Sequence, residues 1–351
     1  MKEFFNRRNF IKNVAVAGIG VGITSNIRGI SLKEEKRIAK GGRSANYRIG
    51  IIGLDTSHSV AFTKIFNDPG ATADLGGFRV VAAYPKGSND IEASVSRIAG
   101  FTKEMEALGV HIVSSIEELI NKSDVVLLET NDGRLHLEQA LPVLKAGKKL
   151  FIDKPLSASL AGVLSIFEAA KKYEIPVFSS SSLRYFENAG DIEMGKIGKV
   201  TGADTFSPAT LEKTHSDLFW YGIHGVELLF TVLGTGCKSV SRVFNEGTEI
   251  VVGIWDENRI GTFRGLRSGK TGYGGIVFGD KDILAINPAK GYRPLLVKIV
   301  EFFQTGKPPV TPEETIEIYA FMAAAEESTR NKGIAVSLES TLEKARQMIK
   351  H

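Results

Sequence analysis

Between residues 47 and 180, short apolar runs alternate with longer stretches in which apolar residues recur at helical spacing. The longer stretches predict helices from Val60 onward and at 90–108, 136–146 and 160–173. Buried strands that alternate with amphipathic helices are typical of a parallel sheet covered on both faces. The pattern therefore predicts a doubly wound parallel sheet. Its strands are expected at 47–54, 78–84, 110–114, 125–130, 149–152 and 176–179.

The second half of the chain has a different pattern. From Val200, short segments rich in β-formers are separated by charged, Gly-containing turns, which predicts an antiparallel sheet with one covered face. Expected strands are 240–244, 249–255, 259–266, 271–278 and 282–286, and expected helices are 291–305 and 312–332. We therefore predict an α/β fold: a doubly wound parallel domain at 47–180, then an α+β domain with an open, mainly antiparallel sheet at 181–351.

The turn after the first strand is the first candidate for chemistry. A strand, a tight turn and a helix bind the pyrophosphate of a dinucleotide at the helix N-terminus. Read from Gly53, the G-x-G-x-x-G fingerprint has Asp55 in place of its second glycine and His58 in place of its third. A carboxylate repels phosphate unless it caps the helix or meets a cation. The residues predicted to border the nucleotide here are Gly53, Leu54, Asp55, Thr56, Ser57 and His58.

The end of the second strand bears on which nucleotide is bound. Dinucleotide sites place Asp or Glu there for the ribose hydroxyls, whereas this chain has Tyr84-Pro85-Lys86-Gly87-Ser88. A lysine in place of a carboxylate tolerates a 2′-phosphate, so NADP is slightly favoured over NAD. A solvated loop lysine is the alternative interpretation of Lys86.

Charge and composition exclude several classes of protein. The net charge of the 351 residues is +4, but residues 1–46 hold ten Lys/Arg and three Asp/Glu, which leaves −3 for the rest. The body of the chain therefore gives no sign of nucleic-acid binding. Cys237 is the single cysteine, and His111 and His215 lack ligand-like spacing, so we expect no metal site.

The leader predicts where the protein works. Arg7-Arg8, Phe10, Ile11 and Lys12 precede a weakly apolar run at 14–23, a pattern that resembles a twin-arginine export signal. The run is too short for a stable membrane span. We expect a periplasmic protein, with a basic tail on a cytoplasmic protein as the alternative. Residues 31–46 are polar and predict a linker, so 1–46 is leader and linker.

Three later segments resemble the Gfo/Idh/MocA oxidoreductases, the family of glucose–fructose oxidoreductase and inositol dehydrogenase. They are Asn131 with His136, Ala140-Leu141 and Ala146-Gly147-Lys148; Asp153-Lys154-Pro155; and Gly222-Ile223-His224-Gly225-Val226-Glu227. The resemblance implies a Rossmann domain and NAD or NADP. It also implies a sugar, polyol or related small molecule as substrate, and dimers or tetramers formed by the second sheet.

The family's functional residues carry over one by one. Lys154 and His224 correspond to the catalytic pair: His224 can take the hydroxyl proton near neutral pH, and Lys154 can hold the substrate oxygen. Thr130, Asn131, His136, Asp153 and Pro155 are expected beside the cofactor. Arg184, Tyr185, Tyr221 and Glu227 are expected on the substrate side, with Glu227 orienting the imidazole of His224.

This chain also departs from the family pattern. Asp153 replaces a glutamate, Trp220 stands where an aspartate often assists the base, and Asp55 and His58 alter the glycine turn. Two alternatives therefore stay open: an NAD-dependent glycosidase of the same fold, and a non-catalytic paralogue that has lost cofactor binding.

Overall fold

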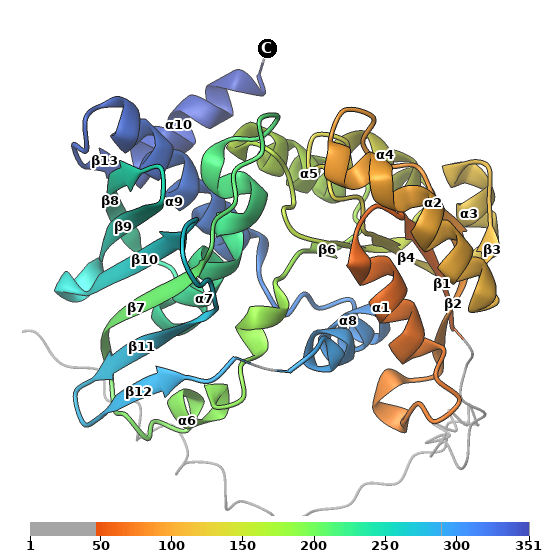
Figure 1. Ribbon diagram of the computed structural model, residues 1–351, viewed down its shortest axis with the longest axis horizontal. Helices are drawn as coiled ribbons and strands as arrows, with labels where there is room; N and C mark the ends of the chain where they lie inside the picture. The colour runs from red at the N-terminus through yellow and green to blue at the C-terminus, as the bar shows by residue number, and fades with distance from the viewer. Residues whose placement is uncertain (1–46, 289, 351) are drawn as a thin grey trace, which may run out of the picture. The chain divides into compact units, whose positions relative to one another are not determined.

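The computed structural model describes residues 47–288 and 290–350, which form two sheets with their helices (Figure 1). The first sheet has six strands in the order β3-β2-β1-β4-β5-β6, and every pair of neighbours is parallel. The predicted doubly wound parallel sheet is confirmed. Its strands are β1 (Tyr47–Ile52), β2 (Phe78–Tyr84), β3 (His111–Ile112), β4 (Val125–Leu128), β5 (Lys149–Ile152) and β6 (Val177–Phe178).

Five helices connect these strands, and side chains cap several of them. Thr56, Ser115 and Ser159 each accept a hydrogen bond from a first-turn amide of the following helix, which satisfies donors that a helix leaves free. Glu118 accepts from the Ser114 amide in return. The helices are α1 (Ser57–Phe66), α2 (Glu92–Ala107), α3 (Ile116–Lys122), α4 (His136–Lys145) and α5 (Leu160–Lys172), with a 3₁₀ turn at Ala73–Leu75.

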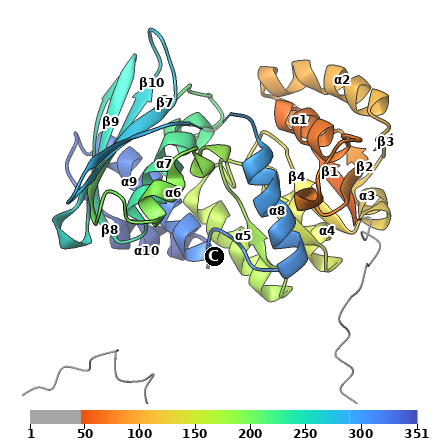
Figure 2. The same ribbon diagram turned by 90° about the horizontal axis from the view of Figure 1, so that it is seen from below.

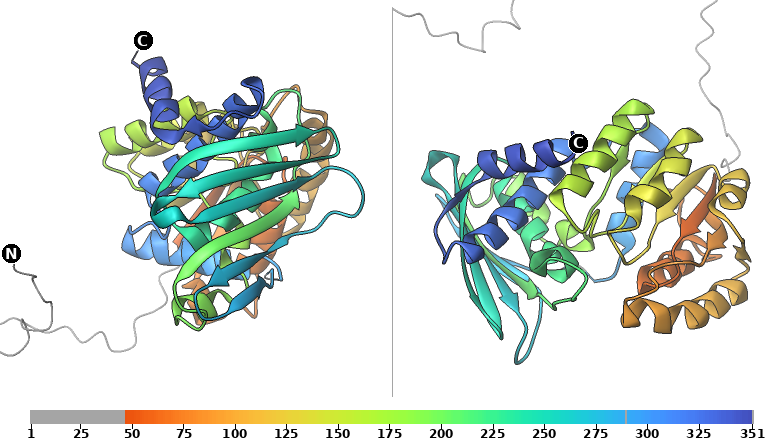
Figure 3. Two further views of the ribbon diagram at one scale, coloured as in Figure 1. Left: turned by 90° about the vertical axis from the view of Figure 1, so that its left-hand side faces the viewer. Right: turned by 90° about the horizontal axis from the view of Figure 1, so that it is seen from above.

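The second sheet has seven strands in the order β12-β11-β7-β10-β9-β8-β13. All neighbours are antiparallel except β7 and β10, so the mainly antiparallel prediction is confirmed. No ribbon of the described residues lies in front of its outer face (Figure 3, left). The strands are β7 (Val200–Pro208), β8 (Cys237–Asn245), β9 (Thr248–Trp255), β10 (Ile260–Leu266), β11 (Gly274–Gly279), β12 (Ile283–Ile286) and β13 (Val336–Ser337).

The inner face of the second sheet packs on α7 and α9. Almost every residue of α7 is buried, and it contacts β7 and β10, while α9 contacts β8 as well as α5 of the first domain. The sequence pattern did not single out α6, α10 or β13, which are short or terminal. These helices are α6 (Ala189–Glu193), α7 (Ile223–Leu233), α9 (Pro312–Arg330) and α10 (Leu338–Met348), with shorter turns at Ser182–Tyr185, Leu218–Gly222 and Asp256–Asn258.

One late helix, α8 (Arg293–Thr305), packs on the first sheet rather than the second (Figure 2). The Lys149 ammonium of β5 also donates to the Phe303 carbonyl of α8. Residue 180 therefore divides the two sheets but not their covering helices. The shared apolar cluster includes Leu295, Leu296, Ile299, Phe302 and Phe303 of α8 with Ile49, Phe62, Phe66, Phe151 and Phe178.

The predicted export leader and linker, residues 1–46, lie outside the described residues. Within the described part of the chain, none of the helices combines the length and the apolar character needed to cross a bilayer.

Candidate active site

A cavity of about 1000 Å³ lies at the carboxyl edge of the first sheet. Thr56, Ser57 and His58 at the start of α1 line it, as do Asn131 and Lys154 at the ends of β4 and β5. The second domain contributes mainly aromatic rings. Ligands of open α/β sheets bind at this edge. The second-domain and neighbouring side chains include Trp220, Tyr221, His224, Tyr273 and Tyr292.

The structure brings the two predicted catalytic residues, Lys154 and His224, to this one cavity. Lys154 is the second residue after β5, is 7% exposed, and places its Nζ 5.6 Å from the centre of the Tyr221 ring. The Tyr221 and His224 rings lie 5.0 Å apart, and the Tyr221 hydroxyl is 2.9 Å from that of Tyr273. The Tyr221 ring therefore neighbours both the ammonium and the imidazole, and its side chain lines the cavity.

The imidazole of His224 is held by Ser181 and is neutral. Its Nδ1 lies 2.7 Å from Ser181 Oγ, and burial, followed by the nearby charges of Lys154 and His58, lowers the pKa of His224 well below its usual value. A serine hydroxyl can donate to Nδ1 or accept from it, so it supports either tautomer. Nε2 can therefore take a proton from a ligand or give one.

Glu227 does not orient His224, contrary to the prediction. Its Oε1 accepts from Ser180 Oγ at 2.9 Å and from Arg184 Nε at 3.0 Å, and its Oε2 accepts from the Ser181 amide at 2.9 Å. Burial raises the pKa of Glu227 even though Arg184 is beside it. Glu227 thus anchors the 180–184 loop, and Ser181 of that loop is the residue that meets the histidine.

Arg184 and Tyr185, predicted on the substrate side, are occupied elsewhere. The Arg184 guanidinium forms ion pairs with Glu227 and with Glu314 at 2.7 Å. The Tyr185 hydroxyl is buried without a hydrogen-bond partner among the described residues, and burial raises its pKa to about 12. Neither side chain lines the cavity.

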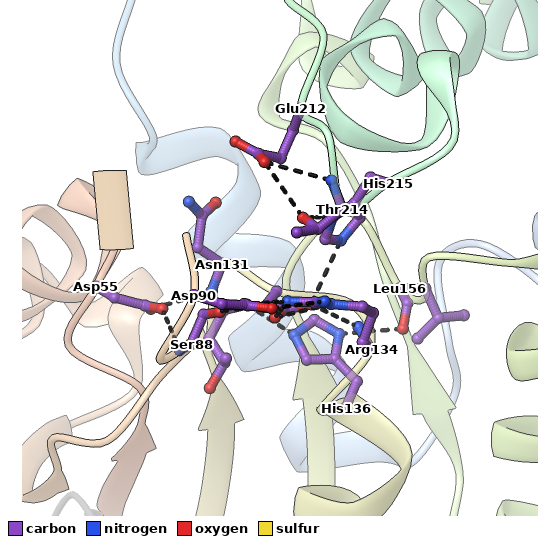
Figure 4. Close-up of polar contacts among 12 residues, drawn as sticks. Asp55, Ser88, Asp90, Asn131, Arg134, His136, Leu156, Glu212, Thr214 and His215 are labelled. Carbon is purple, nitrogen blue, oxygen red and sulfur yellow. Dashed lines mark hydrogen bonds and ion pairs between the residues drawn. The ribbon is translucent and has the colours of Figure 1, made fainter. Parts of the chain in front are cut away.

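Asp55 is bound by the two loops that flank its turn (Figure 4). Its Oδ1 accepts from the Asn131 amide after β4 at 3.0 Å, and its Oδ2 accepts from the Ser88 amide after β2 at 3.3 Å. The carboxylate is fully buried, and burial raises its pKa. One side chain therefore fastens both neighbouring strand ends over the end of β1.

Arg134 joins the same two loops a second time. Its Nη2 lies 2.6 Å from Asp132 Oδ2 and 2.5 Å from Asp90 Oδ1, and it holds the pKa of Asp90 at about 2. His215 of the second domain approaches Asp132 to 3.4 Å. The network, drawn in Figure 4, runs from the loop after β2 to the second domain.

These contacts bear directly on whether a dinucleotide fits. In the ordinary position, its pyrophosphate lies over the glycine turn and the adenosine passes between the ends of the neighbouring strands. Here Asp55 takes the loop amides, and Asp90 and Asp132 already neutralise Arg134. With these contacts in place, the Ser88 and Asn131 amides and the Arg134 guanidinium are already bound, while Thr56, Ser57 and Asn131 still line the cavity beside the turn.

The remaining residues predicted beside the cofactor mainly stabilise the turn and its neighbours. Gly53 has φ +91° and a Cβ on it would lie 2.5 Å from Thr130, so glycine is required there. His136 places its ring nitrogens 2.7 Å from the Thr130 carbonyl and 3.0 Å from the Leu156 carbonyl. Leu54 is buried, Lys86 is exposed away from the cavity, and the Lys154–Pro155 bond is cis.

A cluster of three side chains was missed by the sequence reasoning. His58 Nδ1 lies 2.6 Å from Asp153 Oδ2, and Glu129 lies beside both, so that one ligand atom of each is within 4.8 Å of the others. Burial and the Asp153 charge raise the pKa of Glu129 well above its usual value. Burial also works to raise the pKa of Asp153, but His58 and Lys154 hold it below its usual value. The available signal was Glu129 itself, a charged residue closing the apolar run Val125–Leu128.

Comparison with known proteins supports the resemblance. Residues 47–180 match the Gfo/Idh/MocA model, described as an oxidoreductase family with an NAD-binding Rossmann fold. Inositol 2-dehydrogenase of Cereibacter sphaeroides is 33% identical over 125 residues, 35% of this chain and 32% of that protein. The Salmonella typhimurium inositol 2-dehydrogenase is 23% identical over 219 residues, 60% of this chain and 61% of the relative. The chain therefore matches about a third of the length of the first of these relatives.

Solved structures confirm the two-domain fold. The scyllo-inositol dehydrogenase of Lactobacillus casei, solved with NAD(H) and scyllo-inositol, superposes with a TM-score of 0.64 at 15% identity. The match covers 84% of this chain and 99% of that one. Residues 47–180 thus match an oxidoreductase family model, and the two-sheet fold of the chain is the one found in this solved dehydrogenase.

Proposed function

We propose that this protein is an oxidoreductase of the polyol- or sugar-dehydrogenase type that acts on a hydroxyl or carbonyl group in the cavity. One observation carries the proposal: Lys154 and His224, from different domains, meet at one cavity on the carboxyl edge of the sheet. The match of residues 47–180 to an oxidoreductase family and the partial identity to inositol 2-dehydrogenases support it.

The chain's own residues can manage the proton of such a reaction. A neutral His224 accepts the hydroxyl proton at Nε2, while Ser181 holds Nδ1 at 2.7 Å. The Lys154 ammonium forms no ion pair within the described residues. It is therefore free to donate to the substrate oxygen as negative charge develops there. In the reverse direction the same two groups return the proton.

The lining fits a small polyhydroxylated molecule. Trp220, Tyr221, Tyr273 and Tyr292 offer ring faces and phenol groups, and Ser182, Thr210 and Thr271 offer hydroxyls. Sugars and cyclic polyols present both C–H faces and hydroxyl rims, which such a mixed wall can match. Inositols are the substrates in the names of several relatives, so we propose cyclic polyols and sugars first.

This activity requires NAD or NADP as the hydride carrier. The contacts of Asp55 oppose nucleotide binding, because they occupy the Ser88 and Asn131 amides beside the turn. The loops after β2 and β4 must separate before a nucleotide can occupy its usual place. The slight preference for NADP stays a prediction from the sequence, which has no carboxylate after Tyr84 to take the ribose hydroxyls, although Lys86 itself does not line the cavity.

Calorimetric titration of the purified chain with NAD(H) and NADP(H) tests the proposal, followed by assays of nucleotide reduction with a panel of inositols and aldoses. Binding and reduction support it. Absence of nucleotide binding contradicts it and favours a second function suggested by the Asp55 network, a non-redox acid–base enzyme. That enzyme would convert the same panel without any nucleotide, which product analysis by NMR detects.

Two further properties belong to the proposal. The outer face of the second sheet exposes apolar side chains, which suits a dimer or tetramer, and light scattering measures its mass. The leader predicts export, which cell fractionation of the wild type and of Arg7→Lys with Arg8→Lys tests. The exposed side chains include Phe206, Val243, Ile254, Ile260 and Ile276.

A further inference from the structure

Three ligand-type side chains converge at the ends of neighbouring strands. Glu129 follows β4, Asp153 follows β5, and His58 lies in the first turn of α1 after β1. These strands are adjacent in the sheet order. The Glu129 amide donates to the Ile52 carbonyl and the Asp153 amide to the Leu128 carbonyl, at 2.7 and 2.8 Å. The backbone therefore fixes the positions from which these side chains extend.

Glu129 lacks the partners that a buried carboxylate needs. It is 0% exposed, and both of its oxygens are without a hydrogen bond among the described residues. Asp153 Oδ1, in the same cluster, is also buried and unpartnered. Burying a carboxylate is costly unless it is paired or binds a metal ion. These atoms therefore indicate a group that completes the cluster.

The spacing and the charge of the cluster suit a divalent cation. A tetrahedral ion with bonds of about 2.1 Å holds its ligand atoms about 3.4 Å apart. Here the ligand atoms of all three residues lie within 4.8 Å of one another. His58 Nδ1 and Asp153 Oδ2 share a hydrogen bond at 2.6 Å, so an ion must replace that bond and move the two atoms slightly apart. Lys154 and His58 hold the charge of Asp153, whereas Glu129 has no ion-pair partner among the described residues. A cation that displaces the proton of Glu129 would supply that partner.

We propose that His58, Glu129 and Asp153 form a binding site for a divalent transition metal, of the Zn²⁺ or Mn²⁺ class, at the inner end of the cavity. One imidazole nitrogen with two carboxylates suits these ions. Phe62 stacks on the His58 ring at 5.2 Å and Tyr292 meets it edge-on at 4.7 Å, which fixes the ring. His58 also lines the cavity, so the cluster adjoins the cavity through this side chain.

The site gives a physical role to one of the two changes in the glycine turn, the histidine at position 58. A glycine at position 58 would supply no ligand. Asp55, the other change, lies outside the cluster and is held by two amides. The proposal does not depend on the hydride carrier, because metal binding is measured without nucleotide or substrate.

The test uses the full chain after dialysis against EDTA, titrated with ZnCl₂ and with MnCl₂ by calorimetry. We expect about one ion per chain, a higher melting temperature with metal, and a visible Co²⁺ spectrum on substitution. Glu129→Gln keeps the side-chain size and should weaken binding roughly tenfold or more. Asp55→Asn, the matched change at a buried carboxylate outside the cluster, should bind as the wild type does.

His58→Gln provides a second variant on the edge of the cavity should Glu129→Gln fail to fold. It should weaken binding by a similar factor. The proposal is overturned when the wild type takes up neither ion, or when Glu129→Gln and His58→Gln bind as tightly as the wild type. The latter result would place any bound ion elsewhere on the chain.

Discussion

Gly87 lies directly against the carboxylate of Asp55: a Cβ built on Gly87 would meet Asp55 Oδ2 at 2.0 Å and Cγ at 2.4 Å. The two amides that bind Asp55 prevent its carboxylate from moving aside without loss of hydrogen bonds. Glycine at position 87 thus leaves the space that the carboxylate of Asp55 occupies.

Gly87→Ala should destabilise the protein by about 1–3 kcal/mol, since the new methyl group displaces a buried, hydrogen-bonded carboxylate. Urea denaturation measures this change. Gly100→Ala is the control, because a Cβ there meets nothing within 4 Å and Gly100 lies inside α2. That variant should gain up to about 1 kcal/mol. If Gly87→Ala changes the free energy of unfolding no more unfavourably than Gly100→Ala does, the predicted clash with Asp55 is contradicted.

Asp55→Gly should release the amides of Ser88 and Asn131 and remove a negative charge from the turn. We expect the affinity for NAD(H) or NADP(H) to rise roughly tenfold, the factor that about 1.4 kcal/mol of removed repulsion gives. Calorimetry measures it. Asp90→Asn, which removes a charge from the same loops but leaves Asp55 bound, should give a smaller gain. Equal gains would mean that charge alone, and not the Asp55 contacts, opposes the nucleotide.

His224 should make the protein less stable in mild acid. Its folded pKa lies well below that of the unfolded chain, near 6.5, so the unfolded state binds more protons between the two values. Stability therefore falls as the pH drops below about 6.5, by at most about 1.4 kcal/mol per pH unit for one histidine.

The variant His224→Gln should reduce that slope, as urea titrations between pH 7.5 and pH 5 can show. His136 and His215, whose pKa values burial also lowers, contribute a slope of the same sign that stays in the variant. Glu129, Asp55 and Glu227, with raised pKa values, act in the opposite direction, so the difference from the wild type is the informative quantity. His111→Gln, at an exposed histidine, should leave the slope unchanged. A slope in His224→Gln equal to that of the wild type would show that His224 is not buried in its neutral form.

Glu227→Gln should destabilise the protein by about 3 kcal/mol, because it leaves the buried Arg184 with one carboxylate instead of two. Thermal or urea unfolding measures the loss, and Glu313→Gln, an exposed glutamate of α9, should change it by less than about 0.5 kcal/mol. Combining Glu227→Gln with Arg184→Met should recover part of the loss. No recovery would contradict the assigned pairing.

The sequence predicted the first sheet well because its signals are local. Apolar runs gave all six strands, and the bounds of β2 and β5 were correct to the residue. The pairing of strands in the second sheet was harder to predict, because β7 pairs with β10 and β11, which lie far along the chain. The sequence of residues 200–208 contains no signal that identifies those two strands as its partners.

The site shows the same division between local and distant information. Lys154 and His224 were predicted from recognisable segments, and both line the cavity. The roles of Ser181 and Glu129 depend on contacts between segments that are distant in the sequence. Ser181 lies against His224, and Glu129 lies beside His58 and Asp153. Glu227 was assigned to the wrong neighbour because helical spacing says which residues share a face but not which loop that face meets.

The position of α8 has a consequence for synthesis on the ribosome. Strands β1 to β6 are complete at Phe178, yet the helix that covers Phe62, Phe66 and Phe178 ends only at Thr305. A nascent chain must therefore carry an uncovered aromatic surface while more than a hundred further residues are translated. A truncated product that stops after residue 180 should associate with chaperones or aggregate, although it holds every strand of its sheet.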